Sequence, residues 1–124
     1  IGEATAGVVS NCFATGNVLG LGTVIHTGGF IAHNFGATIN TSYALGNSFG
    51  GSSSDHGFVG WSQAGTYTDN YWNSDATGGA DSATNFTGMS LANLQVQGNY
   101  AGTWDYVNVW KVISGRTPEF ILAR

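Results

Sequence analysis

The sequence predicts an all-β protein: a short parallel β-solenoid (β-helix) of about three coils with a C-terminal capping segment. Short blocks of β-forming residues recur 28 to 30 residues apart, and glycine and asparagine punctuate them. Composition agrees, because 20 glycines disfavour a helical protein when each costs about 1 kcal/mol in a helix interior. Aromatic residues make up 13% of the chain, so a packed core is expected.

The repeat consists of two blocks. The first block, Val9–Asn17, returns thirty residues later as Ile39–Asn47, and a third copy begins at Tyr67. The second block, Gly28–Ala32, returns after 28 residues as His56–Gly60. The blocks are maintained while the loops between them vary in length, which is typical of stacked coils that pair edge to edge about 4.8 Å apart.

Stacking predicts ladders of equivalent side chains. The expected ladders are Phe13, Tyr43 and Tyr71; Val9, Ile39 and Tyr67; Phe30 and Phe58; and a turn ladder of Asn17 and Asn47. Alternation along a strand places large side chains on one face and small side chains on the other. The large set is Val9, Phe13, Ile39 and Tyr43, and the small set is Cys12, Ala14, Ser42 and Ala44. We assign the large set to the interior, and the opposite assignment stays open because small residues also fit a narrow solenoid.

Residues 1–79 are expected to form the repeats and residues 80–124 the capping segment of the same domain. Ser90 can N-cap a helical turn through Leu94. The remaining expected elements are a strand over 107–113, a turn over 115–118 and a strand over 120–122. Large rings are expected to fold over the last coil and cover its open edge, namely Trp104, Tyr106, Trp110 and Phe120.

The N-terminal end has little bulk to cover an edge. Ile1–Gly7 opens almost directly into a repeat and carries one charge, Glu3. Unpaired strand edges are templates for association. We therefore expect this end to join neighbouring repeats in a longer or processed protein, or to contact another subunit.

The first block resembles a known bacterial repeat. Asn11–Val18 reads Asn-Cys-Phe-Ala-Thr-Gly-Asn-Val, which is similar to the first block of the GLUG repeat of bacterial surface proteins. Gly28–Ala32 and Gly57–Gly60 resemble its glycine-rich second block, with Phe in place of Leu at positions 30 and 58. Such repeats occur in filamentous-haemagglutinin-like adhesins and in the non-catalytic region of IgA-cleaving-peptidase-like surface proteins.

That resemblance implies a secreted or cell-surface module that functions in cell adhesion and is not an enzyme. Two alternatives remain open, a self-assembling extracellular filament subunit and a carbohydrate-active β-helix enzyme. Host or environmental glycans, or a surface protein, are the partners that an adhesin implies. A family resemblance does not name the ligand.

Charge and hydropathy exclude two classes of partner. The formal charge is −4, and the cations apart from histidine are Lys111, Arg116 and Arg124, too few to neutralise nucleic-acid phosphates. No apolar run approaches the roughly 20 residues of a membrane-spanning helix.

Metal ions, cofactors and catalytic residues are not expected. The three histidines, His26, His33 and His56, lack the spacing of zinc motifs. In the repeat alignment His33 stands opposite Trp61 and His56 opposite Gly28, so the histidines form no ladder. The stretch from Asp75 to Asp81 lacks the ligand pattern of a calcium loop. Asp55 and Asp69 could approach each other across a coil, but no Lys or Arg precedes Lys111 to assist them.

A carbohydrate site is the sharpest binding hypothesis. Four aromatic residues gather near the third copy: Trp61, Tyr67, Tyr71 and Trp72. Aromatic faces with nearby amides suit sugars. The competing interpretation is that these rings cover the end of the core.

Overall fold

The protein, seen in a computed structural model, is all-β with parallel sheets; the structure describes residues 1–21, 23, 26–50, 54–76 and 86–122. Helix in this part of the chain is confined to α1 (Leu91–Leu94) and one 3-10 turn (Gln97–Asn99). The strands are β1 (Glu3–Ala4), β2 (Val8–Ser10), β3 (Phe13–Ala14), β4 (Val18–Leu19), β5 (His26–Gly28), β6 (Ile31–Asn34), β7 (Thr38–Asn40), β8 (Tyr43–Ala44), β9 (Ser48–Phe49), β10 (Ser54–His56), β11 (Val59–Ser62), β12 (Thr66–Thr68), β13 (Asn70–Asn73), β14 (Phe86–Met89), β15 (Trp110–Lys111) and β16 (Glu119–Phe120).

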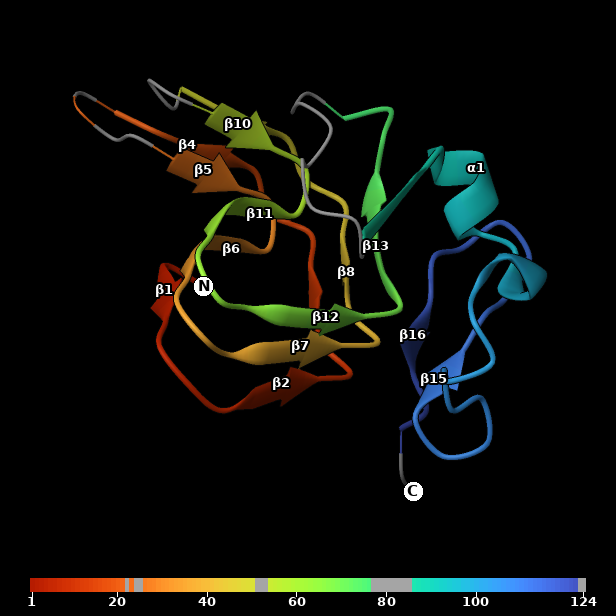
Figure 1. Ribbon diagram of the computed structural model, residues 1–124. Helices are drawn as coiled ribbons and strands as arrows, with labels where there is room; N and C mark the ends of the chain where they lie inside the picture. Colours follow the sequence, from red (N-terminus) through yellow and green to blue (C-terminus); the bar gives the residue numbers. More distant parts are fainter. Residues whose placement is uncertain (22, 24–25, 51–53, 77–85, 123–124) are drawn as a thin grey trace.

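Equivalent strands of successive repeats pair in parallel. The parallel sheets have the orders β1-β6-β11, β2-β7-β12, β3-β8-β13-β14, β4-β9 and β5-β10. Figure 1 shows β2, β7 and β12 lying one above another. Val9 pairs with Ile39, and Ile39 with Tyr67, so the register follows the spacing predicted from the sequence. β15 and β16 form a separate antiparallel pair.

A corner with left-handed backbone separates two strands in each repeat. Asn11, Thr41 and Asp69 occupy it with φ values of 53°, 46° and 53°. The corner interrupts the alternation of side chains, so Ile39 and Ala44 both join the interior although they lie five positions apart. The assignment of the large set to the interior is therefore right for Val9 and Ile39 and wrong for Phe13 and Tyr43, whose places inside are taken by Ala14 and Ala44.

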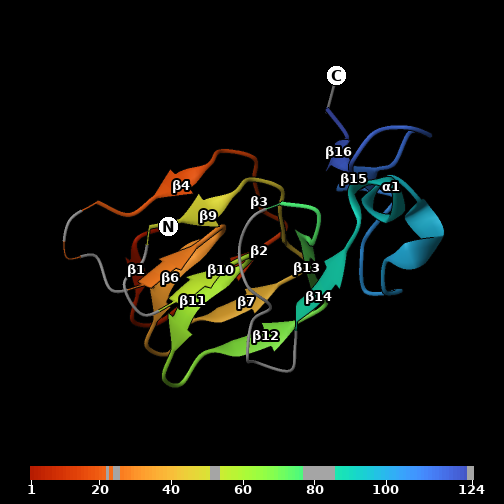
Figure 2. The ribbon, with the colours of Figure 1, turned by 90° about the horizontal axis from the view of Figure 1, so that it is seen from above.

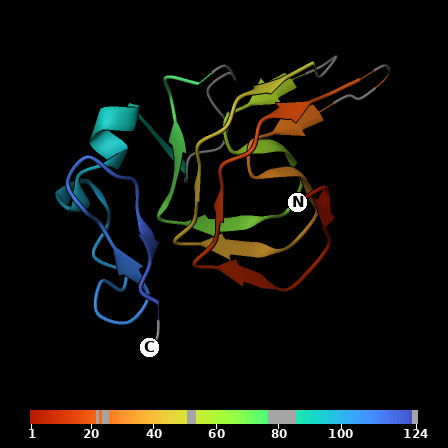
Figure 3. The ribbon, with the colours of Figure 1, turned by 180° about the vertical axis from the view of Figure 1, so that it is seen from behind.

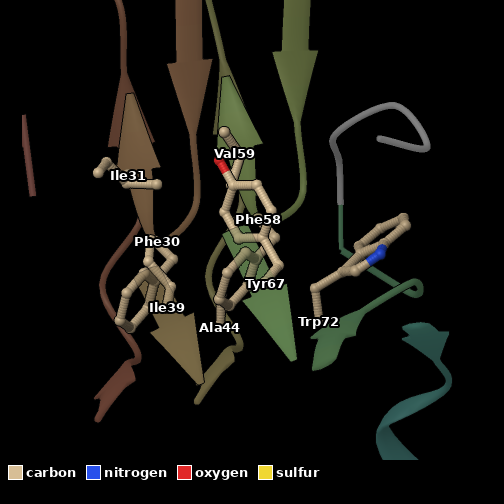
Figure 4. Packing of buried hydrophobic residues seen from close by; sticks show 8 residues of the cluster. All are labelled: Phe30, Ile31, Ile39, Ala44, Phe58, Val59, Tyr67 and Trp72. Atoms are coloured by element: carbon tan, nitrogen blue, oxygen red, sulfur yellow. The ribbon is translucent and has the colours of Figure 1, made fainter. Parts of the chain in front are cut away.

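The interior cluster lies between the sheets, and Figure 4 shows its packing. Its buried members are Phe30, Ile31, Ile39, Ala44, Phe58, Val59, Tyr67 and Trp72. Phe30 stacks on Phe58 with ring centroids 4.7 Å apart, as the repeat predicts, and Phe86 of β14 continues the ladder 5.2 Å from Phe58. Phe86 thus brings a strand from the predicted capping segment into the repeat core.

Trp72 fills space that alanines leave open in the other repeats, because it pairs with Ala44 and Ala44 pairs with Ala14. The indole needs a glycine beside it. A Cβ added to Gly57 would lie 2.0 Å from the Trp72 ring. Glycine at this position is therefore a packing requirement.

A second, lateral cluster covers the outside of the sheet that contains β3, β8, β13 and β14. Its buried members are Tyr43, Tyr71, Leu94, Tyr100, Trp104 and Trp110. Phe13 stacks on Tyr43 with ring centroids 5.4 Å apart, and the ring centroid of Phe120 lies 5.2 Å from that of Phe13. Trp104 contacts both Tyr43 and Tyr71.

After β14, the C-terminal segment accordingly packs beside the repeats rather than over their end (Figures 2 and 3). This corrects the expected end cap. The physical reason is the outward row of Phe13, Tyr43 and Tyr71, an apolar strip that water would otherwise contact. Hydrogen bonds hold the cover in place, since Trp104 Nε1 donates to the Asp69 carbonyl at 3.0 Å and Trp110 Nε1 to Asn11 Oδ1 at 3.3 Å.

Within the C-terminal segment the predicted helical turn is confirmed. Ser90 caps α1, and its side-chain oxygen accepts from the Asn93 amide at 3.2 Å. The strand expected over 107–113 shortens to β15, because Val107 and Asn108 donate their amides to the Asp105 carboxylate in a turn. The final strand, β16, begins one residue before the predicted start.

The N-terminal residues are already part of the repeat pattern. β1 pairs with β6, and the Thr38 amide donates to the Gly7 carbonyl at 2.9 Å, so residues 1–7 match residues 31–37. At this edge Val8 is 70% exposed and Leu19 is 55% exposed. A hollow of about 400 Å³ opens here onto the interior, lined partly by Ala14 and Phe30.

The expected turn ladder is present at another corner. The backbone amide and the side-chain amide of Asn47 both donate to Asn17 Oδ1, at 2.9 and 3.1 Å. These bonds link neighbouring repeats outside the core and satisfy backbone groups that a corner leaves without a strand partner.

Candidate functional site: an exposed surface of aromatic rings and histidines

The four residues predicted to bind sugar do not form one surface. Tyr67 and Trp72 are buried in the interior cluster, and Tyr71 is buried in the lateral cluster. Trp61 alone of the four is exposed, at 39%. The prediction of a four-residue platform is therefore wrong. The competing interpretation was that the rings cover the end of the core. The structure instead packs Tyr67 and Trp72 within the interior cluster and Tyr71 within the lateral cluster.

Trp61 instead belongs to a different set of rings, which we call the Trp61 surface. It consists of Trp61 on β11, His33 on β6, His26 on β5 and Phe35 directly after β6. Glu3 of β1 borders it, because the strand register pairs Glu3 with His33 and His33 with Trp61.

The contacts around Trp61 are mutual. Phe35 and His33 meet the indole at steep angles of 71° and 70°, with centroid distances of 5.5 and 5.8 Å. His26 lies nearly parallel to the indole at 6.1 Å and contacts His33 at 5.2 Å. Edge-to-face and offset arrangements of this kind are favourable for aromatic pairs, so the indole is held in one orientation while part of it stays exposed.

The repeat alignment predicts part of this surface. Trp61 stands opposite His33, and His56 opposite Gly28, as expected from the spacing. Reasoning from the sequence missed His26 and Phe35, because His26 comes from another sheet and Phe35 follows the end of its strand. No spacing in the sequence relates His26 to Trp61.

Burial and neighbouring histidines disfavour a positive charge on His26. Burial lowers the pKa of His26, and the neighbouring His33 and His56 lower it further, so its imidazole is uncharged at pH 7. His56 Nδ1 lies 3.0 Å from the Val59 carbonyl oxygen. Within the described ranges no group of three or more His, Cys, Asp or Glu residues is arranged to hold a metal ion.

The acidic residues considered for catalysis belong to different elements of the fold. Asp55 is on β10, whereas Asp69 is at the corner between β12 and β13 and accepts a hydrogen bond from the Thr103 hydroxyl. No strand register brings the two together. Asp75 accepts from the Leu91 amide at 2.8 Å, and Asp81 lies outside the described residues.

Comparisons with known proteins give one weak relative. No protein-family model and no solved structure matches this sequence. The chain is 30% identical over 117 residues to a protein of Evansella cellulosilytica described as "Putative Gly-rich membrane protein"; the alignment covers 90% of this chain and 13% of that protein. This chain thus spans a small part of the relative's length. In the described part of the chain, no helix has both the length and the apolar character to cross a membrane.

Proposed function

We propose that this chain is a parallel β-solenoid of the GLUG-repeat type, and that it acts as a non-enzymatic structural and adhesive module of a secreted or cell-surface bacterial protein. The observation that carries the proposal is the parallel pairing of equivalent strands at the 28- and 30-residue spacing of the repeat. Stacked repeats of this kind give a rigid body with extended outer faces. The relative's description as a membrane protein supports a place at the cell envelope.

A non-enzymatic role is supported by what the acidic side chains do. Each of several carboxylates is engaged in a local structural contact: Asp69 with Thr103, Asp75 with Leu91, Asp105 with Asn108, and Glu119 with Lys111 and Arg116. A glycosidase needs two carboxylates that flank one bond. The described acids are instead distributed along the chain.

The stacking can be tested by crosslinking. In a Cys12→Ser background, cysteines at Thr38 and Thr66 lie on directly paired positions, whereas Val8 and Thr66 are two strands apart. A thiol reagent that spans one inter-strand spacing of about 4.8 Å should bridge the first pair and leave the second unbridged. Equal bridging of both pairs, read by intact mass, would contradict the solenoid.

Adhesion is tested by displaying the chain on beads and measuring retention on glycan-coated and protein-coated surfaces, with analysis of released products. Retention without cleavage is the expected result. Cleaved oligosaccharides would show an enzyme, and no retention on any surface would remove the adhesive part of the proposal.

Self-assembly is a second candidate, favoured by the exposed N-terminal edge. Within the described residues β2 pairs with β7 alone, and Val8 on β2 and Leu19 on β4 are exposed apolar side chains. Changing both to lysine should prevent assembly, because a charge on an edge opposes strand addition. Val107→Lys is the matched control, since Val107 is 81% exposed elsewhere. A wild-type chain that sediments as a monomer at high concentration excludes this candidate.

A further inference from the structure

We propose that the Trp61 surface is a subsite for one sugar ring of a neutral glycan, with the exposed indole as the stacking platform. This inference rests on the proposed adhesive function and names its ligand class. It assigns the platform to Trp61 with His33, His26, Phe35 and Glu3, in place of the four aromatic residues that the sequence grouped together.

The indole combines exposure with a fixed orientation. Tryptophan side chains are usually well covered, yet Trp61 is 39% exposed, whereas the neighbouring Tyr67, Tyr71 and Trp72 are buried. Phe35 and His33 pack against it at steep angles and hold it in place. A rigid, partly exposed ring binds a ligand without a further cost of ordering the side chain.

Three polar groups lie in a row at the Trp61 surface. Among the described residues, no hydrogen bond is made by Trp61 Nε1, the His33 imidazole or the Glu3 carboxylate. The strand register places these three residues in a row across neighbouring strands, about 4.8 Å apart. An indole N–H donates, a carboxylate accepts, and an imidazole ring carries two nitrogen atoms that can form hydrogen bonds, so the row can bind hydroxyl groups, which act both as donors and as acceptors.

A sugar ring has the matching chemistry. A pyranose presents an apolar face of C–H bonds, which stacks on an aromatic ring, and a rim of hydroxyl groups, which needs directed hydrogen bonds. An apolar peptide side chain would form no hydrogen bonds with this row of polar groups. Each polar group that it covers without a partner would lower the free energy gained on binding.

Charge argues for a neutral sugar. Lys111 and Arg116 lie in the C-terminal segment at β15 and before β16, and His26 is held uncharged at pH 7. Glu3 adds a negative charge beside His33. Among the described residues, sialylated and sulfated glycans would therefore meet no Lys or Arg on this surface and would meet one repelling carboxylate.

The experiment uses the whole 124-residue chain, biotinylated and multimerised on streptavidin, because single-ring subsites bind weakly and avidity raises the signal. An array of neutral, sialylated and sulfated oligosaccharides is the probe. Neutral glycans should bind, Trp61→Ala should weaken binding by about tenfold or more, and Trp61→Phe should recover part of the loss. His33→Ala should weaken binding through the lost hydrogen bonds. Circular dichroism checks that each variant folds.

Phe49→Ala is the matched control, since Phe49 is an exposed ring, at 41%, outside the Trp61 surface. The inference fails if no neutral glycan binds, if only charged glycans bind, or if Phe49→Ala weakens binding as much as Trp61→Ala. An empty array together with retention on protein-coated surfaces overturns the sugar subsite alone, and failure on both kinds of surface overturns the adhesive function as well.

Discussion

Trp110 is the residue whose loss should report most directly on the lateral cover. Its side chain is fully buried, with ring centroids 4.7 Å from Phe120, 4.8 Å from Trp104 and 5.9 Å from Tyr43. Its Nε1 donates to Asn11 Oδ1, so one residue joins the C-terminal segment to the first repeat.

Replacing Trp110 with alanine removes these contacts and leaves a cavity at the centre of the lateral cluster. Large aromatic residues changed to alanine in a core cost about 3–5 kcal/mol. The lost hydrogen bond adds about 1 kcal/mol. Since a domain is typically stable by about 5–15 kcal/mol, the variant should lose a large share of its free energy of unfolding.

Urea denaturation followed by far-ultraviolet circular dichroism measures this loss without relying on tryptophan fluorescence. Val107→Ala, at an 81% exposed position of the same segment, should change the free energy of unfolding by less than about 0.5 kcal/mol. If Trp110→Ala costs less than about 1 kcal/mol, the C-terminal segment does not stabilise the repeats from the side and the packing argument is wrong.

Three further changes test other parts of the fold. Gly57→Ala should lower the free energy of unfolding by about 1–3 kcal/mol in urea titrations, because the new methyl group collides with Trp72, whereas Gly102→Ala meets no atom within 4 Å and should be neutral. Thr41→Asn should raise the melting temperature, because a β-branched residue at φ 46° costs about 1 kcal/mol more than asparagine. The asparagine amide has both a donor and an acceptor with which to replace the bonds between the Thr41 hydroxyl and Asn11, and a lower melting temperature would contradict this expectation. Burial raises the pKa of four tyrosines above the usual value near 10, namely Tyr43, Tyr71, Tyr100 and Tyr106. The folded state should therefore lose stability as the pH rises above 10, and tyrosinate absorbance should increase together with the loss of circular dichroism. Ionisation of these tyrosines near pH 10 without unfolding would refute this expectation.

The repeat spacing was sufficient to predict the pairing of the strands within the two recognised blocks, but not the pairing of β1 with β6 or of β14 with β13. Equal spacing implies equal position in each repeat, and the pairs Phe13 with Tyr43 and Trp61 with His33 follow from it directly. The direction of each side chain was harder, because alternation holds only along an uninterrupted strand. The left-handed residue at position 41 ends that alternation, and a threonine in this conformation gives no warning in the sequence.

The candidate site shows the same limit. Trp61 and His33 are related by the repeat, so half of the surface could be predicted. His26 joins them from a different sheet of the same repeat, and the packing between sheets depends on how the chain turns at its corners. That information is not contained in a spacing of 28 or 30 residues.

The corner conformation also links the two clusters to each other. Because it turns Ala44 inward, Tyr43 must point outward, and the same holds for the paired residues of the neighbouring repeats. An outward aromatic strip needs a cover, and the rings of the C-terminal segment supply it. The rings of the C-terminal segment cover much of the outer face of this sheet, although Phe13 stays 41% exposed, and the outer residues of β6 and β11 stay accessible as well. The backbone geometry at residues 11, 41 and 69 therefore decides which aromatic residues the C-terminal segment buries, while Trp61 on β11 stays exposed outside that contact.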